Sequence, residues 1–90
     1  MDIRERLYVS TIASDATEIA EHYGIGIEID EFCTASNMEG EKFEFNDHIV
    51  RKKMASAHRH ILHGPFNELF PAAIDPEARA LAYKRFEQTY

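Results

Sequence analysis

The clearest pattern in the chain is the segment at positions 25–32, in which hydrophobic and small or polar residues alternate from Ile25 to Asp30. This two-residue period predicts a β-strand with its isoleucines on one face and with Glu28 and Asp30 on the other. Shorter apolar runs, rich in residues that favour strands, predict two further strands at residues 7–11 and 60–63. We therefore expect a sheet of three strands.

Apolar residues at helical spacing predict helices that alternate with these strands. The first helix covers residues 16–23, with Asp15 and an acid three residues later in a capping-box pattern, and with Gly24 as its stop. Residues 33–46 show no period, and we expect them to form a long loop.

Asn46 and Asp75 are predicted to cap the two remaining helices. The helix after Asn46 runs to residue 57, and the helix after Asp75 begins with Pro76 and continues to the C-terminus. The apolar stripe of the last helix consists of Ala78, Leu81, Ala82 and Phe86. The predicted order is therefore βαβαβα, an α/β fold whose helical crossovers make the strands parallel. Three strands and three helices cannot cover or close such a sheet alone.

Length and charge limit the classes of protein to which this chain can belong. The 90 residues, 44% of them hydrophobic, suffice for one small domain and not for two. Sixteen acidic residues outnumber ten basic ones, and the net charge of −6 disfavours a general nucleic-acid binder. Residues 1–47 carry three basic and twelve acidic groups, and residues 48–90 carry seven and four. This asymmetry allows head-to-tail association between copies.

The cysteine content and the apolar runs bear on cellular location. The single Cys33 excludes an intrachain disulfide, and no apolar run approaches the ~20 residues of a membrane span. No segment resembles a signal peptide. We therefore expect a cytoplasmic protein without a membrane partner.

Three short segments, in this order and spacing, resemble the start of the sugar phosphate isomerase/epimerase family. They are Gly-Ile-Gly-Ile-Glu-Ile at 24–29, Leu-His-Gly-Pro-Phe at 62–66 and Asp-Pro-Glu at 75–77. That family shares its xylose isomerase-like TIM barrel with AP endonucleases, and the resemblance spans nearly all of residues 5–90. It implies that residues 1–90 form a single partial TIM-barrel-like domain, equivalent to the first three βα units of a (β/α)8 barrel.

The resemblance also implies a metal-dependent isomerase or epimerase that acts on a small sugar or sugar phosphate. Family members hold a divalent metal (manganese, magnesium, zinc or cobalt) with Glu, Asp, His and Glu on the later strands. A complete barrel needs about 250 residues, so those strands fall outside this chain. We expect a fragment that is not active alone, a truncated product, or a unit that rebuilds a larger sheet as a homo-oligomer. Whether this chain by itself holds a metal stays open.

Glu28 and His63 are the expected substrate-facing residues, because the active site of a TIM barrel lies at the carboxyl ends of its strands. The resemblance places a His that faces the substrate at position 63, and the matching His of AP endonucleases is a metal ligand. The alternative is a histidine that hydrogen-bonds a loop carbonyl and holds the turn at Gly64. Glu28 is expected to face the barrel axis, where its carboxylate needs a partner from a substrate, a cation or a missing strand. We expect Asp30 to be solvated and Phe32 to shape the mouth.

The loop after the third strand contains Phe66, Asn67 and Glu68, where the resemblance implies substrate binding. Aromatic and polar side chains together suit the apolar faces and hydroxyl edges of a sugar. A loop that only packs Phe66 and Phe70 over a helix end would have the same sequence. Packing is the interpretation that the sequence favours.

Three further groups are interpreted as structural. On a strand, His58 and His60 face opposite to His63, so the three histidines cannot hold one zinc ion. The basic run at residues 51–53 is expected to be a solvated helix face. Cys33 is expected to be a small packing residue without a catalytic partner.

Two functions from different classes therefore stay open. One is part of an isomerase that forms an enediolate, in which a metal polarises the carbonyl, a carboxylate moves the proton, and Glu28 and His63 orient the substrate. The alternative is a non-catalytic, self-associating α/β module whose sheet edges pair with other copies. A function like that of the AP endonucleases agrees with the resemblance but not with the negative net charge of the chain, so nucleic acid is not an expected partner.

Overall fold

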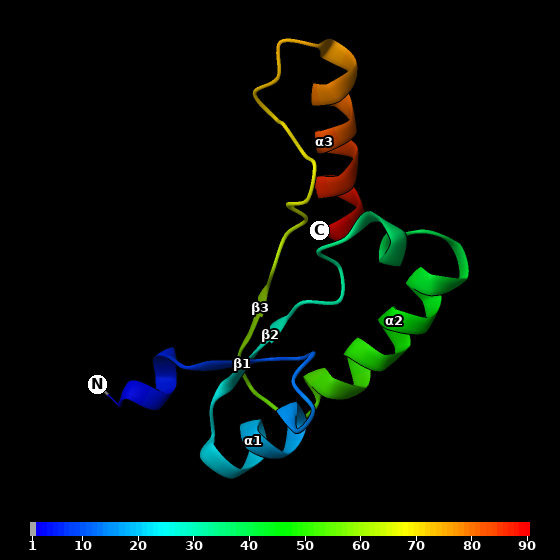
Figure 1. Ribbon diagram of the computed structural model, residues 1–90. Coiled ribbons are helices and arrows are strands. Elements are labelled where there is room, and N and C mark those ends of the chain that lie inside the picture. Colours follow the sequence, from blue (N-terminus) through cyan, green and yellow to red (C-terminus); the bar gives the residue numbers. More distant parts are fainter. Residues whose placement is uncertain (1) are drawn as a thin grey trace.

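Strands and helices alternate along the chain as a βαβαβα unit (Figure 1). The structure is a computed structural model that describes residues 2–90. The strands are β1 (Tyr8–Ser10), β2 (Gly26–Ile29) and β3 (His60–Leu62), and the helices are α1 (Ala16–Tyr23), α2 (Gly40–Met54) and α3 (Pro76–Thr89). Two short 3-10 helices, η1 (Ile3–Arg6) and η2 (Ala35–Met38), precede β1 and α2.

The three strands form one parallel sheet in the order β1-β2-β3. This confirms the predicted α/β class and the parallel sheet. Ser10 lies beside Glu28, and Glu28 lies beside Ile61, so these three side chains share one face of the sheet. Right-handed crossovers between neighbouring strands place α1 and α2 on the opposite face.

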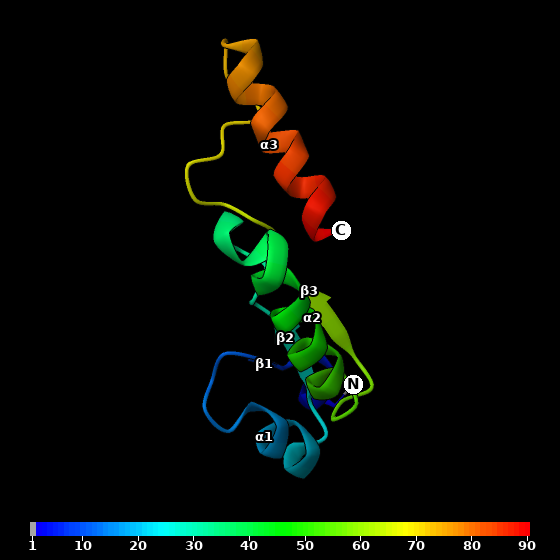
Figure 2. The same ribbon diagram turned by 90° about the vertical axis from the view of Figure 1, so that its right-hand side faces the viewer.

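The core lies on the helical face of the sheet. Ile27 is fully buried and Ile29 is nearly so, as the alternation predicts. Ile29 packs with Phe32 and Val50, and Figure 2 shows α2 in front of β2 and β3. Phe32 therefore belongs to the core and does not shape the mouth, because β2 ends at Ile29 and the chain turns before Phe32. On the other face Ile61 is 40% exposed.

The predicted ends of α1 and α3 are partly confirmed. Gly24 ends α1 in the left-handed conformation, with φ 64°, and the carboxylate of Asp75 accepts a hydrogen bond from the backbone N–H of Glu77 at the start of α3. Asp15, in contrast, makes no capping hydrogen bond with its side chain, so the predicted capping box is wrong. Its ψ of 31° departs from the extended backbone that a capping residue needs.

Helix α2 begins at Gly40, six residues before the predicted cap at Asn46. Its first turns carry Phe43 and Phe45, which are 37% and 66% exposed. These two residues do not belong to a buried apolar stripe, so the sequence pattern did not reveal the first turns of the helix. Asn46 lies inside the helix, and its side-chain amide donates to the carbonyl of Lys42 at 2.8 Å. This bond to the preceding turn uses the side chain that was expected to cap the helix.

Helix α3 stands away from the sheet, and its C-terminal end lies near the carboxyl ends of the strands (Figure 1). Ala82 is buried, whereas Leu81 is 44% exposed, so the predicted apolar stripe does not pack on the sheet. The segment of residues 63–75 carries the start of α3 outward before the chain returns. The radius of gyration is accordingly 15.0 Å, against about 12 Å for a compact chain of this length.

Candidate functional site

Polar side chains from all three strands meet at the carboxyl edge of the sheet. Ser10 ends β1, Asp30 directly follows β2, and His63 directly follows β3. The ligand atoms of Asp30, Cys33 and His63 lie within 4.8 Å of one another. Ligands of open parallel sheets bind at this edge. We call Glu28, Asp30, Cys33 and His63 the carboxyl-edge cluster.

Asp30 is half-buried, which corrects the expectation that it is solvated. The hydroxyl of Ser10 donates to Asp30 Oδ2, and the backbone N–H of Asp30 donates to Thr11 Oγ1 at 3.0 Å. The second carboxylate oxygen, Oδ1, is buried and meets no donor within residues 2–90. The carboxylate is therefore held in place at the sheet edge, and a protonated Glu28 is the nearby group that could donate to its second oxygen.

Glu28 finds its partner within this chain. A hydrogen bond with the side chain of Asp30, then burial and the charge of Asp30, raise the pKa of Glu28, whereas the nearby His63 lowers it. Glu28 therefore keeps its proton to a higher pH than an isolated glutamic acid does. The sequence required such a partner and did not identify Asp30 as the residue that supplies it.

We expect the raised pKa of Glu28 to appear in the pH dependence of stability. The folded protein holds this proton more tightly than the unfolded chain, whose pKa is near 4.5. The resulting stabilisation is complete below pH 4.5 and is lost as the pH rises through the raised value. Glu28→Gln keeps a neutral group at every pH, so it should be more stable than the wild type at neutral pH.

Urea denaturation at a series of pH values measures this difference. The advantage of Glu28→Gln should shrink as the pH falls towards 4.5. The control variant is Glu44→Gln, which changes an exposed acid on α2 and should show no such trend. An advantage that grows as the pH falls would contradict the assignment.

The ring of His63 hydrogen-bonds a loop carbonyl, as one sequence interpretation allowed. Nδ1 lies 2.7 Å from the carbonyl oxygen of Gly64. A carbonyl oxygen only accepts, so Nδ1 carries the proton, and Nε2 of the neutral ring offers a lone pair. The arrangement is thus compatible with both interpretations, because the bond to Gly64 orients a ring whose other nitrogen can bind a ligand.

The loop residues extend from the cluster into solvent. Phe66 and Phe70 are 58% and 63% exposed, so the packing role that the sequence favoured is wrong. The loop runs alongside α3 (Figure 1), but the helix does not bury these two rings. The rings of Phe66 and His63 have centroids 5.2 Å apart. Asn67 and Glu68 are exposed, and Glu68 has a left-handed φ of 59°.

Cys33 belongs to the cluster and is not a simple packing residue. It is half-buried, and its thiol donates to the backbone carbonyl of Asp30 at 2.8 Å. Burial, followed by the charge of Asp30, raises the pKa of this thiol. The sequence signal was present, because Cys33 follows Asp30 by three residues at a strand end.

His60, the first residue of β3, faces away from this cluster, as predicted. Nε2 of His60 lies 2.8 Å from the carbonyl oxygen of Met54 and 2.9 Å from that of Ala57. Both carbonyls belong to the end of α2 and the segment that follows it. His60 is therefore directed towards the helical face and His63 towards the carboxyl-edge cluster.

A buried ion pair behind the cluster was not predicted. The ammonium group of Lys53 donates to the carbonyl of Thr11 at 2.7 Å and lies 3.5 Å from the buried carboxylate of Glu31. Glu31 also accepts a hydrogen bond from the hydroxyl of Thr11, which is 1% exposed. Lys53 thus joins α2 to the ends of β1 and β2. The expectation of a solvated face is wrong for Lys53, whereas Arg51 and Lys52 are exposed as expected.

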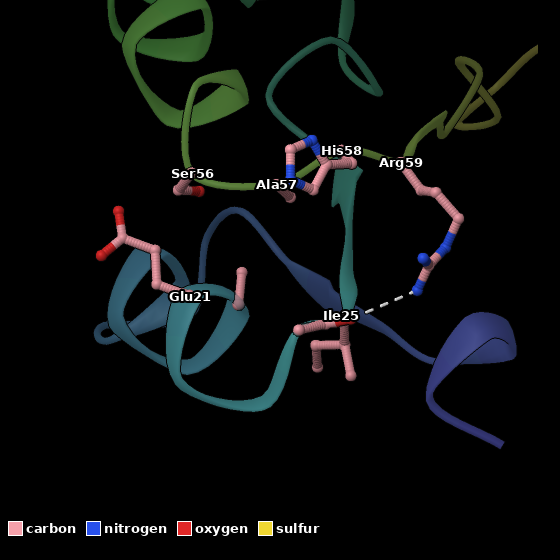
Figure 3. A pocket seen from close by; sticks show the side chains of 8 residues that line it. Glu21, Ile25, Ser56, Ala57, His58 and Arg59 are labelled. Carbon is pink, nitrogen blue, oxygen red and sulfur yellow. Dashed lines mark hydrogen bonds between the residues drawn. The ribbon is translucent and has the colours of Figure 1, made fainter. Parts of the chain in front are cut away.

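A cavity of about 240 Å³ lies at the opposite, amino end of the sheet (Figure 3). Its lining includes Glu21, His58 and Arg59. The guanidinium group of Arg59 donates to the carbonyl of Arg4 at 2.7 Å and to that of Gly24 at 3.5 Å. These contacts connect η1, the end of α1 and the segment before β3. In barrels of parallel strands this end serves stability, whereas the carboxyl ends carry the chemistry.

Comparisons with protein-family models, with characterised proteins and with solved structures find no match to this chain. The resemblance to the sugar phosphate isomerase/epimerase family therefore stays an expectation that rests on three short segments. Within residues 2–90, no helix is both long and apolar enough to cross a lipid bilayer. The carboxyl-edge cluster is consequently the feature of this chain that bears most directly on its function.

Proposed function

We propose that this chain is the N-terminal part of a metal-dependent sugar or sugar phosphate isomerase or epimerase. The observation that carries the proposal is the convergence of Glu28, Asp30 and His63 at the carboxyl edge of a sheet ordered β1-β2-β3. Sequential parallel strands with their crossover helices on one face are the arrangement of a TIM-barrel segment. In the proposal the cluster forms one wall of the active site.

The face of the sheet that α1 and α2 leave uncovered supports this proposal. Tyr8 lies over Gly26 so closely that a Cβ atom at position 26 would be 2.5 Å from the ring. Ser10, Glu28 and Ile61 form the next row in register. TIM barrels fill their interior with such rows from neighbouring strands. Further strands, from a longer chain or from other copies, would complete the barrel.

In the proposed reaction, this chain positions the sugar. The carboxyl group of Glu28 accepts hydrogen bonds from sugar hydroxyls, and Asp30 and His63 line the same side of the sugar. Phe66 presents an apolar ring to the C–H face of the sugar. The metal that the resemblance implies would polarise the carbonyl for enediolate formation. Its ligands lie on later strands, so we assign no proton-transfer step to these residues.

The test combines molar mass with a sensitive assay of carbon acidity. The protein is incubated with ketoses or ketose phosphates and Mn²⁺ in D₂O, and NMR follows exchange of the hydrogen next to the carbonyl. Light scattering gives the oligomeric state of the same sample. We expect an oligomer, and metal-dependent exchange in that oligomer would mean that copies of the chain rebuild a working site.

Variants of the cluster make this test specific. Glu28→Gln and His63→Ala should each slow exchange by about 100-fold, because the sugar would no longer be held in its reactive position, whereas Glu44→Gln, at an exposed position, should not. An oligomer that binds no sugar and catalyses no exchange would argue against the proposal.

A second candidate, a non-catalytic and self-associating α/β module, is favoured by the exposed apolar side chains. Ile61, Phe70, Leu81 and Tyr83 are each at least 40% exposed. Uncovered apolar surface of this kind marks interaction sites, and the open β1 and β3 edges can pair with other strands. A folded 10.4 kDa monomer with a cooperative melting transition would contradict self-association.

A further inference from the structure

We infer that Asp30, Cys33 and His63 form a binding site for a zinc-like divalent cation. The inference does not depend on the proposed isomerase, whose metal the family resemblance places on later strands. It rests on three different donor groups, a carboxylate oxygen, a thiol sulfur and an imidazole nitrogen, which lie together at the ends of β2 and β3.

The distances between the donor atoms suit one small ion. All three atoms lie within 4.8 Å of one another. Ligands of a tetrahedral zinc ion, bound at about 2.0 to 2.3 Å, are roughly 3.4 to 3.8 Å apart. Closure around the ion therefore requires a contraction of at most about 1.4 Å. Asp30 and Cys33 already share one turn, in which the thiol contacts the carbonyl of Asp30.

The hydrogen bonds around the donors are those that orient metal ligands. Nδ1–H of His63 donates to the carbonyl of Gly64, which leaves Nε2 for the ion. The hydroxyl of Ser10 holds Oδ2 of Asp30, while Oδ1 is buried without a donor from residues 2–90. A cation bound to Oδ1 would satisfy this atom. The hydrogen bonds that would hold Asp30 and His63 in position around an ion are therefore already present.

The donor set selects the class of cation. A thiolate with an imidazole favours zinc or cobalt over magnesium and calcium, which prefer oxygen ligands alone. One carboxylate and one thiolate neutralise the charge of a divalent cation. The ammonium group of Lys53 pairs with Glu31, so it does not compete with the cation for the carboxylate of Asp30. Binding releases the thiol proton of Cys33 to solvent. Three protein ligands leave the fourth position of a tetrahedral ion to water or to the neighbouring Glu28.

Cobalt spectroscopy tests the site directly. Metal-free protein is titrated with Co²⁺, and we expect a thiolate-to-cobalt charge-transfer band together with the intense visible bands of tetrahedral cobalt. Zn²⁺ should remove both signals by displacement. Cys33→Ser should abolish the charge-transfer band, and Asp30→Asn and His63→Ala should each weaken Co²⁺ binding at least tenfold. The control is His48→Gln, an exposed histidine on α2, which should bind as the wild type does.

A second measurement uses the fact that Cys33 is the sole cysteine. A thiol reagent is added with and without Zn²⁺, and Zn²⁺ should slow the modification of Cys33 at least tenfold. Asp30→Asn and His63→Ala should lose this protection, and circular dichroism checks that each variant keeps its helices. Absence of the charge-transfer band, or equal Zn²⁺ protection in all variants, would overturn the inference.

Discussion

Gly26→Ala is expected to lower the free energy of unfolding by about 2 to 3 kcal/mol. A Cβ atom at position 26 would lie 2.5 Å from two ring carbons of Tyr8 and 2.9 Å from the backbone carbonyl oxygen of Arg59. The ring can move, but the carbonyl cannot yield cheaply, because it accepts the backbone N–H of Ile27 at 3.0 Å. The added methyl group therefore strains the pairing of β2 with β3.

Chemical denaturation measures this effect, and the chain offers a matched control. At Gly64 an added Cβ would meet the hydroxyl of Tyr90 at 2.9 Å, and Tyr90 is 79% exposed and free to move aside. Gly64→Ala should therefore cost less than about 1 kcal/mol. Equal losses in the two variants would contradict the close contact at Gly26.

Lys53→Met is expected to lower the free energy of unfolding by about 2 kcal/mol. Methionine fills the same space and removes the ammonium group that lies 3.5 Å from the carboxylate of Glu31. Glu31 would then be buried without its cation, and the carbonyl of Thr11 would lose a donor. The side chain of Lys53 is 27% exposed, so the loss should be smaller than for a fully buried pair.

The adjacent lysine provides the control for this variant. Lys52 is exposed on the same helix, and Lys52→Met should change stability by less than about 0.5 kcal/mol. The double variant Lys53→Met with Glu31→Gln should recover part of the loss, because it leaves no unpaired buried charge. If Lys53→Met were as stable as Lys52→Met, the ion pair would not hold α2 against the sheet.

Local patterns predicted most of the secondary structure. The alternation around Ile27 and Ile29 identified β2 and the face that becomes the core. Gly24 and Asp75 identified the end of α1 and the start of α3, because their chemistry acts on their own backbone. The start of α2 was missed because Phe43 is partly exposed and leaves no periodic signal.

The candidate site was predicted less completely. Glu28 was selected from its parity on the strand and His63 from its place at a strand end, both in line with the family resemblance, and the structure brings them to the same edge. Asp30 and Cys33 were expected to be solvated and packed, respectively, and they instead complete the carboxyl-edge cluster. Their roles depend on how the chain turns after β2, which no period in the sequence describes.

By itself, the sequence determined the order of strands and helices, the buried face of β2 and the placement of Glu28 on the opposite face. These properties follow from side-chain periods within a few residues. The tertiary structure decided that α3 stands away from the sheet, that Lys53 reaches Glu31, and that Cys33 meets His63. Such contacts join residues more than twenty positions apart, so they depend on strand register and loop path.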